Sequence, residues 1–203
     1  MSDTDDYILQ KIKTYVWSGF YSPEEVDSMI DDILEEDANE AMLRAAVEPE
    51  FAAKAAAEED WPEETDCDRL DGAFEELNDG GIIALHNAGY TMSDGLSDVS
   101  EELHERGRDQ VRGFCFYHGQ DLERAVDGGG LMLAFGAIPD EPAKNKKIGE
   151  LLKYTLEEWG FTVEWSGDVG TRLSLPTLDW KRSLEQSEDE DFDDDDDFDE
   201  DDD

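Results

Sequence analysis

The sequence predicts an α/β fold in which a helical N-terminal region precedes a small mixed sheet, built from βαβ units and ending in a C-terminal hairpin. Helical spacing of apolar residues dominates as far as residue 62. Beyond it, short and continuously apolar runs alternate with helical patterns, which indicates strands that are buried on both faces. Two last apolar runs flank the glycine-containing turn 167–170, an arrangement typical of an antiparallel hairpin.

The helical N-terminal region is expected to span residues 1–62. Apolar residues in 6–19 recur at the spacing of one helical face. A second helix starts at Ser22, because a serine N-cap is followed by proline and, three residues after the cap, by Glu25. The stretch 39–59 is rich in alanine, which favours helix by intrinsic propensity.

The α/β body is expected to span residues 63–182. Its strands are the short apolar runs, and its helices are the amphipathic stretches between them, several of which end at glycine. The expected strands are 81–86, 112–117 and 131–138, the expected helices are 66–80, 94–106, 121–126 and 144–159, and the hairpin pairs 161–165 with 172–175.

Residues 183–203 are expected to form an acidic, disordered tail. From Glu188 onward every residue is Asp or Glu except Phe192 and Phe198, so this segment has almost nothing to bury. The whole chain carries a formal net charge of −41. Such a charge has two interpretations, a salt-rich, halophilic environment or a surface that meets a basic partner protein.

Composition also excludes several classes of function. The chain has only 16 Lys and Arg residues against 57 Asp and Glu, so we expect no direct binding of nucleic acid. No apolar run approaches the ~20 residues of a membrane span, and the first residues lack the pattern of a signal peptide. We therefore expect a soluble, cytoplasmic protein without membrane contact. Phosphate-binding glycine loops and the common hydrolase motifs are absent from the sequence.

Polar side chains follow the first two expected strands. The carboxyl ends of successive parallel strands meet at one edge of a sheet, where open α/β sheets bind ligands. Histidine and carboxylate together suit acid–base chemistry. The catalytic candidates are His86, His118 and Asp121, and the ligand-binding candidates are Asn87, Tyr90, Ser93, Asp94 and Gln120.

The same residues also have a purely structural interpretation. Asp94 and Asp121 are suitable helix N-caps, and Gly89 and Gly119 are suitable turn glycines. The two histidines could satisfy backbone groups at strand ends. The sequence indicates no metal ligand set and no cofactor.

Several segments resemble an uncharacterised, mainly bacterial family, the domain of unknown function 6891. The similarity runs from Ile8 to Arg182 and leaves out the acidic tail. It implies a shared fold and transfers no catalytic residues. The segments that carry it are residues 17–20, 66–70, 86–95, 116–122 and 133–136.

The leading functional prediction is a ligand-binding or protein-interaction module without enzymatic activity. One alternative is a small hydrolase or metal-dependent enzyme that uses His86 and His118. Another is an acidic inhibitor of a basic partner, such as an immunity protein or a nucleic-acid mimic. The sequence leaves the ligand, the partner and the oligomeric state open.

Overall fold

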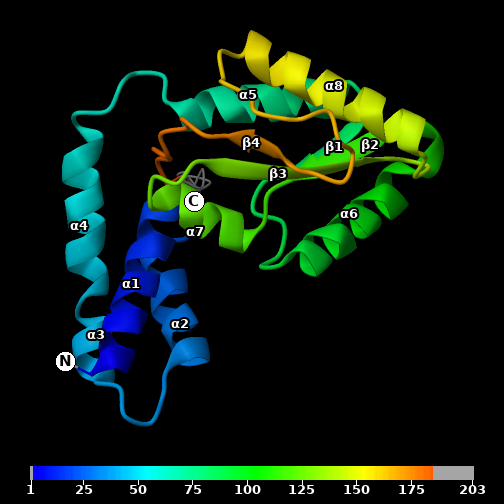
Figure 1. Cartoon of the computed structure of the whole chain (residues 1–203). Coiled ribbons are helices and arrows are strands. Elements are labelled where there is room, and N and C mark those ends of the chain that lie inside the picture. The colour runs from blue at the N-terminus through cyan, green and yellow to red at the C-terminus, as the bar shows by residue number, and fades with distance from the viewer. Residues whose placement is uncertain (1, 185–203) are drawn as a thin grey trace, which may run out of the picture.

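The structure is a computed structural model that describes residues 2–184 (Figure 1). The acidic tail expected from residue 183 therefore lies almost wholly outside the described residues. The first four helices form an arm beside the sheet-containing body (Figure 1). They are α1 (Asp3–Ser18), α2 (Pro23–Ile33), α3 (Glu40–Arg44) and α4 (Val47–Glu58).

The helical arm has a hydrophobic core of its own. Ile8, Ile12 and Val16 of α1 are almost fully buried against Val26 and Ile30 of α2. Helix α2 begins as the sequence predicts, with Ser22 accepting from the Glu25 amide and the Glu25 carboxylate accepting from the Ser22 amide. This reciprocal capping satisfies two backbone donors that the first turn would otherwise leave free.

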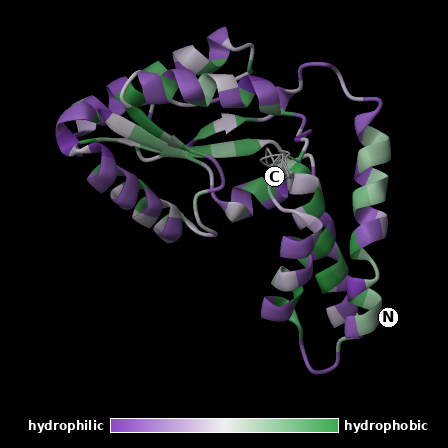
Figure 2. Cartoon of the chain, turned by 180° about the vertical axis from the view of Figure 1, so that it is seen from behind, coloured by the Kyte–Doolittle hydropathy of each residue, from purple (hydrophilic) through white to green (hydrophobic). Residues whose placement is uncertain are grey.

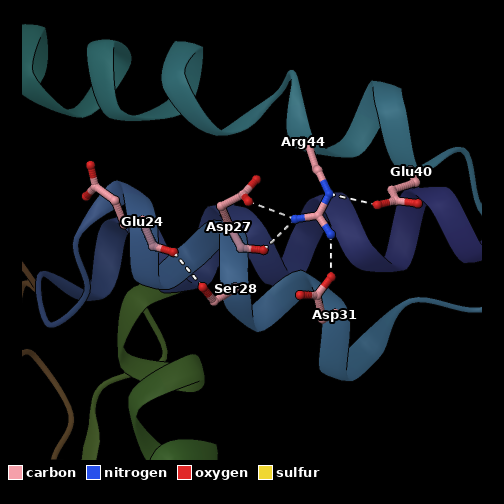
Figure 3. Close-up of polar contacts among 6 residues, drawn as sticks. All are labelled: Glu24, Asp27, Ser28, Asp31, Glu40 and Arg44. Atoms are coloured by element: carbon pink, nitrogen blue, oxygen red, sulfur yellow. Dashed lines mark hydrogen bonds and ion pairs between the residues drawn. The ribbon is translucent and has the colours of Figure 1, made fainter.

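Arg44 ties the short helix α3 to α2 (Figure 3). Its guanidinium donates to the Asp27 carboxylate at 2.8 Å and to the Asp27 backbone carbonyl at 2.8 Å. The same group also contacts the carboxylates of Asp31 and Glu40. A planar guanidinium with several donors can serve three carboxylates at once, which a lysine ammonium cannot do in this geometry.

The body contains one four-stranded sheet in the order β1-β2-β3-β4. Strands β1 and β2 are parallel and are joined through helix α6 (Met92–Arg106), which makes one βαβ unit. Strands β2 and β3 are antiparallel, as are β3 and β4. The strands are β1 (Ile82–Leu85), β2 (Gly113–Phe116), β3 (Leu131–Ala137) and β4 (Leu173–Leu175).

Two details of the sheet differ from the sequence-based expectation. Helix α7 (Gly119–Val126), between β2 and β3, is only ~12 Å long at 1.5 Å per residue. A helix this short does not carry the chain back along the ~23 Å of β3, as a second βαβ unit with parallel strands would require. Strand β3 instead begins at the end of the sheet at which β2 finishes, and it runs antiparallel to β2. The expected C-terminal hairpin is reduced to β4 and a single antiparallel bridge between Glu164 and Ser174.

Helices cover both faces of the sheet. Helices α5 (Asp66–Asp79) and α8 (Pro142–Glu158) lie on one face, and α6 lies on the other (Figure 1). The hydropathy colouring shows the strands as largely apolar, whereas the helices that cover them carry many hydrophilic residues (Figure 2). None of the helices between residues 2 and 184 is long and apolar enough to cross a bilayer.

The C-terminal segment of the described chain fastens the arm to the body. The Trp180 indole donates to the backbone carbonyl of Ser18 at the end of α1, at 3.1 Å. Arg182, whose side chain is 6% exposed, pairs with Asp71 of α5 and lies over the Phe20 ring, 4.7 Å from its centroid. The arm is therefore held next to the sheet edge at which β1 and β2 end.

Candidate functional site

The loops that follow β1 and β2 lie side by side at the sheet edge, as the parallel pairing of these strands requires. Backbone hydrogen bonds join them, from the Ala88 amide to the Tyr117 carbonyl at 2.9 Å and from the Gly119 amide to the Gly89 carbonyl at 2.9 Å. At Gly119 a Cβ atom would lie 2.7 Å from the Tyr90 ring, so glycine is required for this close approach.

A cleft of about 270 Å³ separates these loops from the helical arm. Its walls come from α1 and α2 on one side and from the two strand-end loops and α7 on the other. The lining residues are Thr14, Tyr15, Ser18, Tyr21 and Met29 from the arm, and Asn87, Gly89, Tyr90, Gly119, Leu122 and Glu123 from the body.

Asn87 and Tyr21 connect the two walls of this cleft. The Asn87 side-chain amide donates to the Tyr21 hydroxyl at 3.0 Å. Asn87 has a backbone φ of 45°, a left-handed conformation that asparagine tolerates better than most residues. Its side-chain oxygen takes part in no hydrogen bond with any residue from 2 to 184, so an acceptor remains available at the cleft.

Three tyrosines give the cleft apolar walls with polar tips. The rings of Tyr15 and Tyr21 pack edge to face with centroids 5.8 Å apart, and Tyr90 is 49% exposed. Burial raises the pKa of the Tyr15 hydroxyl, which therefore stays protonated at neutral pH. A tyrosine ring with a protonated hydroxyl can pack against a flat ligand and also donate a hydrogen bond to it.

A neutralised ion pair stands at the rim of the cleft. Lys11 of α1 bonds Glu123 of α7, contacts the Tyr90 hydroxyl at 3.3 Å and lies 5.4 Å from the centroid of its ring. Burial opposes the charge of the Lys11 ammonium, but the hydrogen bonds to Glu123 and Tyr90 outweigh it and raise its pKa. The pair therefore links arm and body with little net charge.

The structure does not bring the two candidate histidines together. The pairing of Leu85 with Phe116 puts His86 level with Tyr117 and His118 one residue further along. Side chains alternate between the faces of a sheet, so this offset of one residue directs the two imidazoles to different faces.

His86 is held on the side of α5. It stacks on Phe74 with ring centroids 4.4 Å apart, and its Nδ1 lies 3.0 Å from the Tyr117 hydroxyl. Its Nε2 lies 3.4 Å from the Asp71 carboxylate. Burial, together with the positive charge of Arg182, lowers the pKa of His86 to about 3. The imidazole is therefore neutral at neutral pH.

His118 belongs to a separate buried group. Its Nε2 lies 3.2 Å from the Asp121 carboxylate, which also accepts from the Arg172 guanidinium at 2.7 Å and 2.9 Å. Asp121 is thus a salt-bridge partner in the first turn of α7, and His118 itself occupies the N-cap position of that helix. The prediction that Asp121 is an N-cap is therefore wrong, because Asp121 is the third residue of α7 and the N-cap is His118.

The other candidates lie away from the cleft lining. Thr91, rather than Asp94, is the N-cap of α6, and Asp94 accepts from the Thr91 amide at 2.9 Å in a capping box. Ser93 and Gln120 are exposed. Of the five ligand-binding candidates, Asn87 and Tyr90 line the cleft. Across residues 2–184, no group of three or more His, Cys, Asp or Glu side chains could hold a metal ion.

Sequence reasoning missed the wall of the cleft that the arm supplies. Tyr15 reads as part of the apolar face of α1, and Tyr21 follows the helix in a short connection. The one sequence feature near these two tyrosines that pointed to the site is the segment 17–20. This segment, like the strand-end loops, is among those that resemble the family. Their contact with residue 87 depends on packing between segments far apart in the sequence.

Comparison with known proteins identifies a family for this chain. The family described as Domain of unknown function (DUF6891) matches residues 1–184, which include the arm, the sheet and the residues around Trp180 and Arg182 that fasten the two together. No curated protein and no solved structure matches the chain significantly. The resemblance found in the strand-end loops is thereby confirmed, and the chain belongs to the DUF6891 family.

Proposed function

We propose that this protein binds a small molecule in the cleft between the helical arm and the strand-end loops. The observation that carries this proposal is that the arm and the loops after two parallel strands enclose one cavity of about 270 Å³. Its volume lies just below the range of roughly 300–1,000 Å³ that is typical of small-molecule sites, which favours a small ligand. The edge formed by the carboxyl ends of parallel strands is also the usual ligand position in α/β sheets.

The lining indicates an uncharged, planar ligand that carries hydrogen-bonding groups. Tyrosine rings favour a flat apolar body, while the Asn87 oxygen and the tyrosine hydroxyls can bind donors and acceptors at its rim. The one charged lining residue, Glu123, is already paired with Lys11. A chain with a net charge of −41 also repels anions at long range.

Acid–base chemistry at the two histidines has weaker support. A pKa of about 3 makes the His86 imidazole a poor proton acceptor at neutral pH. His118 is 5% exposed and is engaged by Asp121, away from the cleft lining. The enzyme alternative that uses these histidines therefore ranks below ligand binding.

The test is a fragment screen against the full chain by ligand-observed NMR. A library of uncharged heterocycles is compared with matched carboxylates and amines, and hits are titrated into two cleft variants. Tyr21→Phe removes one hydroxyl, and Asn87→Gly removes the amide while it preserves the backbone conformation. Each should weaken binding by roughly two- to tenfold, the value of one hydrogen bond.

Ser93→Ala and Gln120→Ala serve as controls, because both residues are exposed and lie outside the cleft lining. They should bind the hits with unchanged affinity. The proposal fails if the uncharged compounds yield no hits. It also fails if the two cleft variants bind every hit as tightly as the parent chain does.

A further inference from the structure

A second cavity lies at the other end of the sheet and differs in character from the cleft. Its volume is about 410 Å³. It lies near the start of α8, which Figure 1 shows at the end of the sheet away from the helical arm. Its floor is apolar and is made by Val111, Ile138, Ile148 and Leu151, whereas its rim carries Arg112, Lys144 and Lys147.

The rim concentrates positive charge in a chain with very little of it. Lys144 pairs with Glu141 at 3.0 Å, but both side chains are about half exposed, so this pair is weak. Within residues 2–184, Arg112 and Lys147 form no ion pair with a carboxylate. Arg112 donates instead to the backbone carbonyl of Gly80. This cavity therefore presents an apolar floor beneath unneutralised cations.

We propose that the acidic C-terminal segment of this same chain, residues 188–203, docks in this cavity with Phe198 on the apolar floor. In this segment each phenylalanine is flanked on both sides by carboxylates. An aromatic ring between carboxylates is complementary to an apolar floor between cations, because burial of the ring brings both kinds of charge together.

The chain is long enough for this contact. From Leu184, the last described residue, to Phe198 there are 198 − 184 = 14 residues, which span up to ~46 Å when extended. The longest strand, β3, is about half that length at ~23 Å. An extended chain therefore carries Phe198 past the length of β3 with ~23 Å to spare, whereas Phe192, six residues nearer, passes it by only ~3 Å.

Electrostatics favour this occupant over other positions for the segment. The rest of the chain repels a run of carboxylates almost everywhere, since outside residues 188–203 acidic residues outnumber basic ones by 43 (57 − 14) to 16. Attachment to the same chain also raises the effective concentration of the segment to about the millimolar range. A separate acidic partner has to compete with this local concentration, which favours the segment of the same chain as the occupant of the cavity.

Paramagnetic relaxation in the full chain tests the proposal. Asp201→Cys carries a nitroxide label, because Cys67 and Cys115 are buried, with exposures of 1% and 0%. At low ionic strength the amide signals of Val111, Ile148 and Leu151 should be lost. They should return in molar salt, which screens the attraction.

Charge-reversal variants identify the surface involved. Arg112→Glu combined with Lys147→Glu should restore the amide signals at the cavity. The matched control is Lys146→Glu combined with Lys153→Glu, which makes the same charge change on α8 at residues outside the cavity lining. The control should leave the broadening in place. Phe198→Ser should reduce the broadening even though every carboxylate of the segment remains.

Three outcomes overturn the proposal. The first is broadening that spreads evenly over the surface or is missing at the cavity. The second is equal loss of broadening in the cavity pair and in the control pair, which indicates a general charge effect. The third is broadening that vanishes when the labelled chain is diluted with unlabelled chain, because the segment then docks on a second copy.

Discussion

The side-chain amide of Asn87 donates to the hydroxyl of Tyr21 at 3.0 Å, across a separation of 66 residues in the sequence. This hydrogen bond joins the loop after β1 to the connection between α1 and α2. It therefore holds together the two walls of the cleft.

Substitution of Asn87 should separate the effect of the hydrogen bond from that of the backbone conformation. Asn87→Ala loses the hydrogen bond and forces a Cβ-bearing residue without a polar side chain to keep a φ of 45°. We expect it to lower the free energy of unfolding by about 2–3 kcal/mol. Asn87→Gly loses only the hydrogen bond and should cost about 1 kcal/mol or less.

Urea unfolding followed by circular dichroism provides the measurement. The informative quantity is the difference between the two variants rather than either value alone. Equal destabilisation by alanine and glycine would show that the backbone conformation at residue 87 carries no cost.

His86 should make folded stability depend on pH. Its pKa is about 3 in the folded chain, against 6.5 for the exposed side chain. As pH falls below ~6.5 the unfolded chain binds a proton at His86 and the folded chain does not. The contribution of neutral His86 to the free energy of unfolding is therefore fully present above pH ~6.5. It is lost toward pH 3, by at most about 1.4 kcal/mol per pH unit.

The free energy of unfolding of the parent chain and of His86→Gln, measured from neutral pH down to ~pH 4.5, reveals this contribution as a difference in slope. Glutamine retains a polar group near Tyr117 but does not titrate. His104→Gln is the matched control, because His104 is exposed on α6. Parallel curves for the parent chain and His86→Gln would contradict the low pKa.

Arg44 should stabilise the helical arm through geometry as well as charge. Arg44→Lys keeps the positive charge but loses the planar set of donors that reaches Asp27, Asp31 and Glu40 (Figure 3). We expect both Arg44→Lys and Arg44→Gln to lower the melting temperature, with lysine recovering part of the glutamine loss. Molar salt should narrow the difference between lysine and glutamine, because it screens the exposed carboxylates.

Differential scanning calorimetry measures these melting temperatures. Lys146→Gln is a suitable control, because Lys146 forms one exposed ion pair 4.0 Å long with Glu150. It should leave the melting temperature nearly unchanged. Full recovery by Arg44→Lys would mean that charge alone suffices at this position.

Both cysteines should be unreactive while the chain is folded. Burial raises the pKa of the Cys67 thiol to about 12, and it raises the pKa of Cys115 as well. Only the thiolate reacts readily, so alkylation at neutral pH should be slow until the protein unfolds. Mass spectrometry after timed exposure to iodoacetamide, with and without urea, measures the rates. Rapid labelling of Cys67 without urea would show that the start of α5 opens.

The sequence by itself determined the local elements of this fold. The capping pattern at Ser22 and Glu25 marks the start of α2, and β1, β2 and β3 fall within the apolar runs 81–86, 112–117 and 131–138. These features could be predicted because caps depend on residues three apart and strands on short apolar runs. The parallel pairing of β1 with β2 also followed from the helical stretch between them.

Only the tertiary structure decided what those elements do together. A register offset of one residue directs His86 toward Phe74 and His118 toward Asp121, although both follow strands that end at the same edge. The cleft depends on α1 packing beside α7, which brings Tyr15 and Tyr21 to the loops at Asn87. Side-chain direction and long-range packing depend on contacts between distant segments, which local patterns in the sequence do not encode.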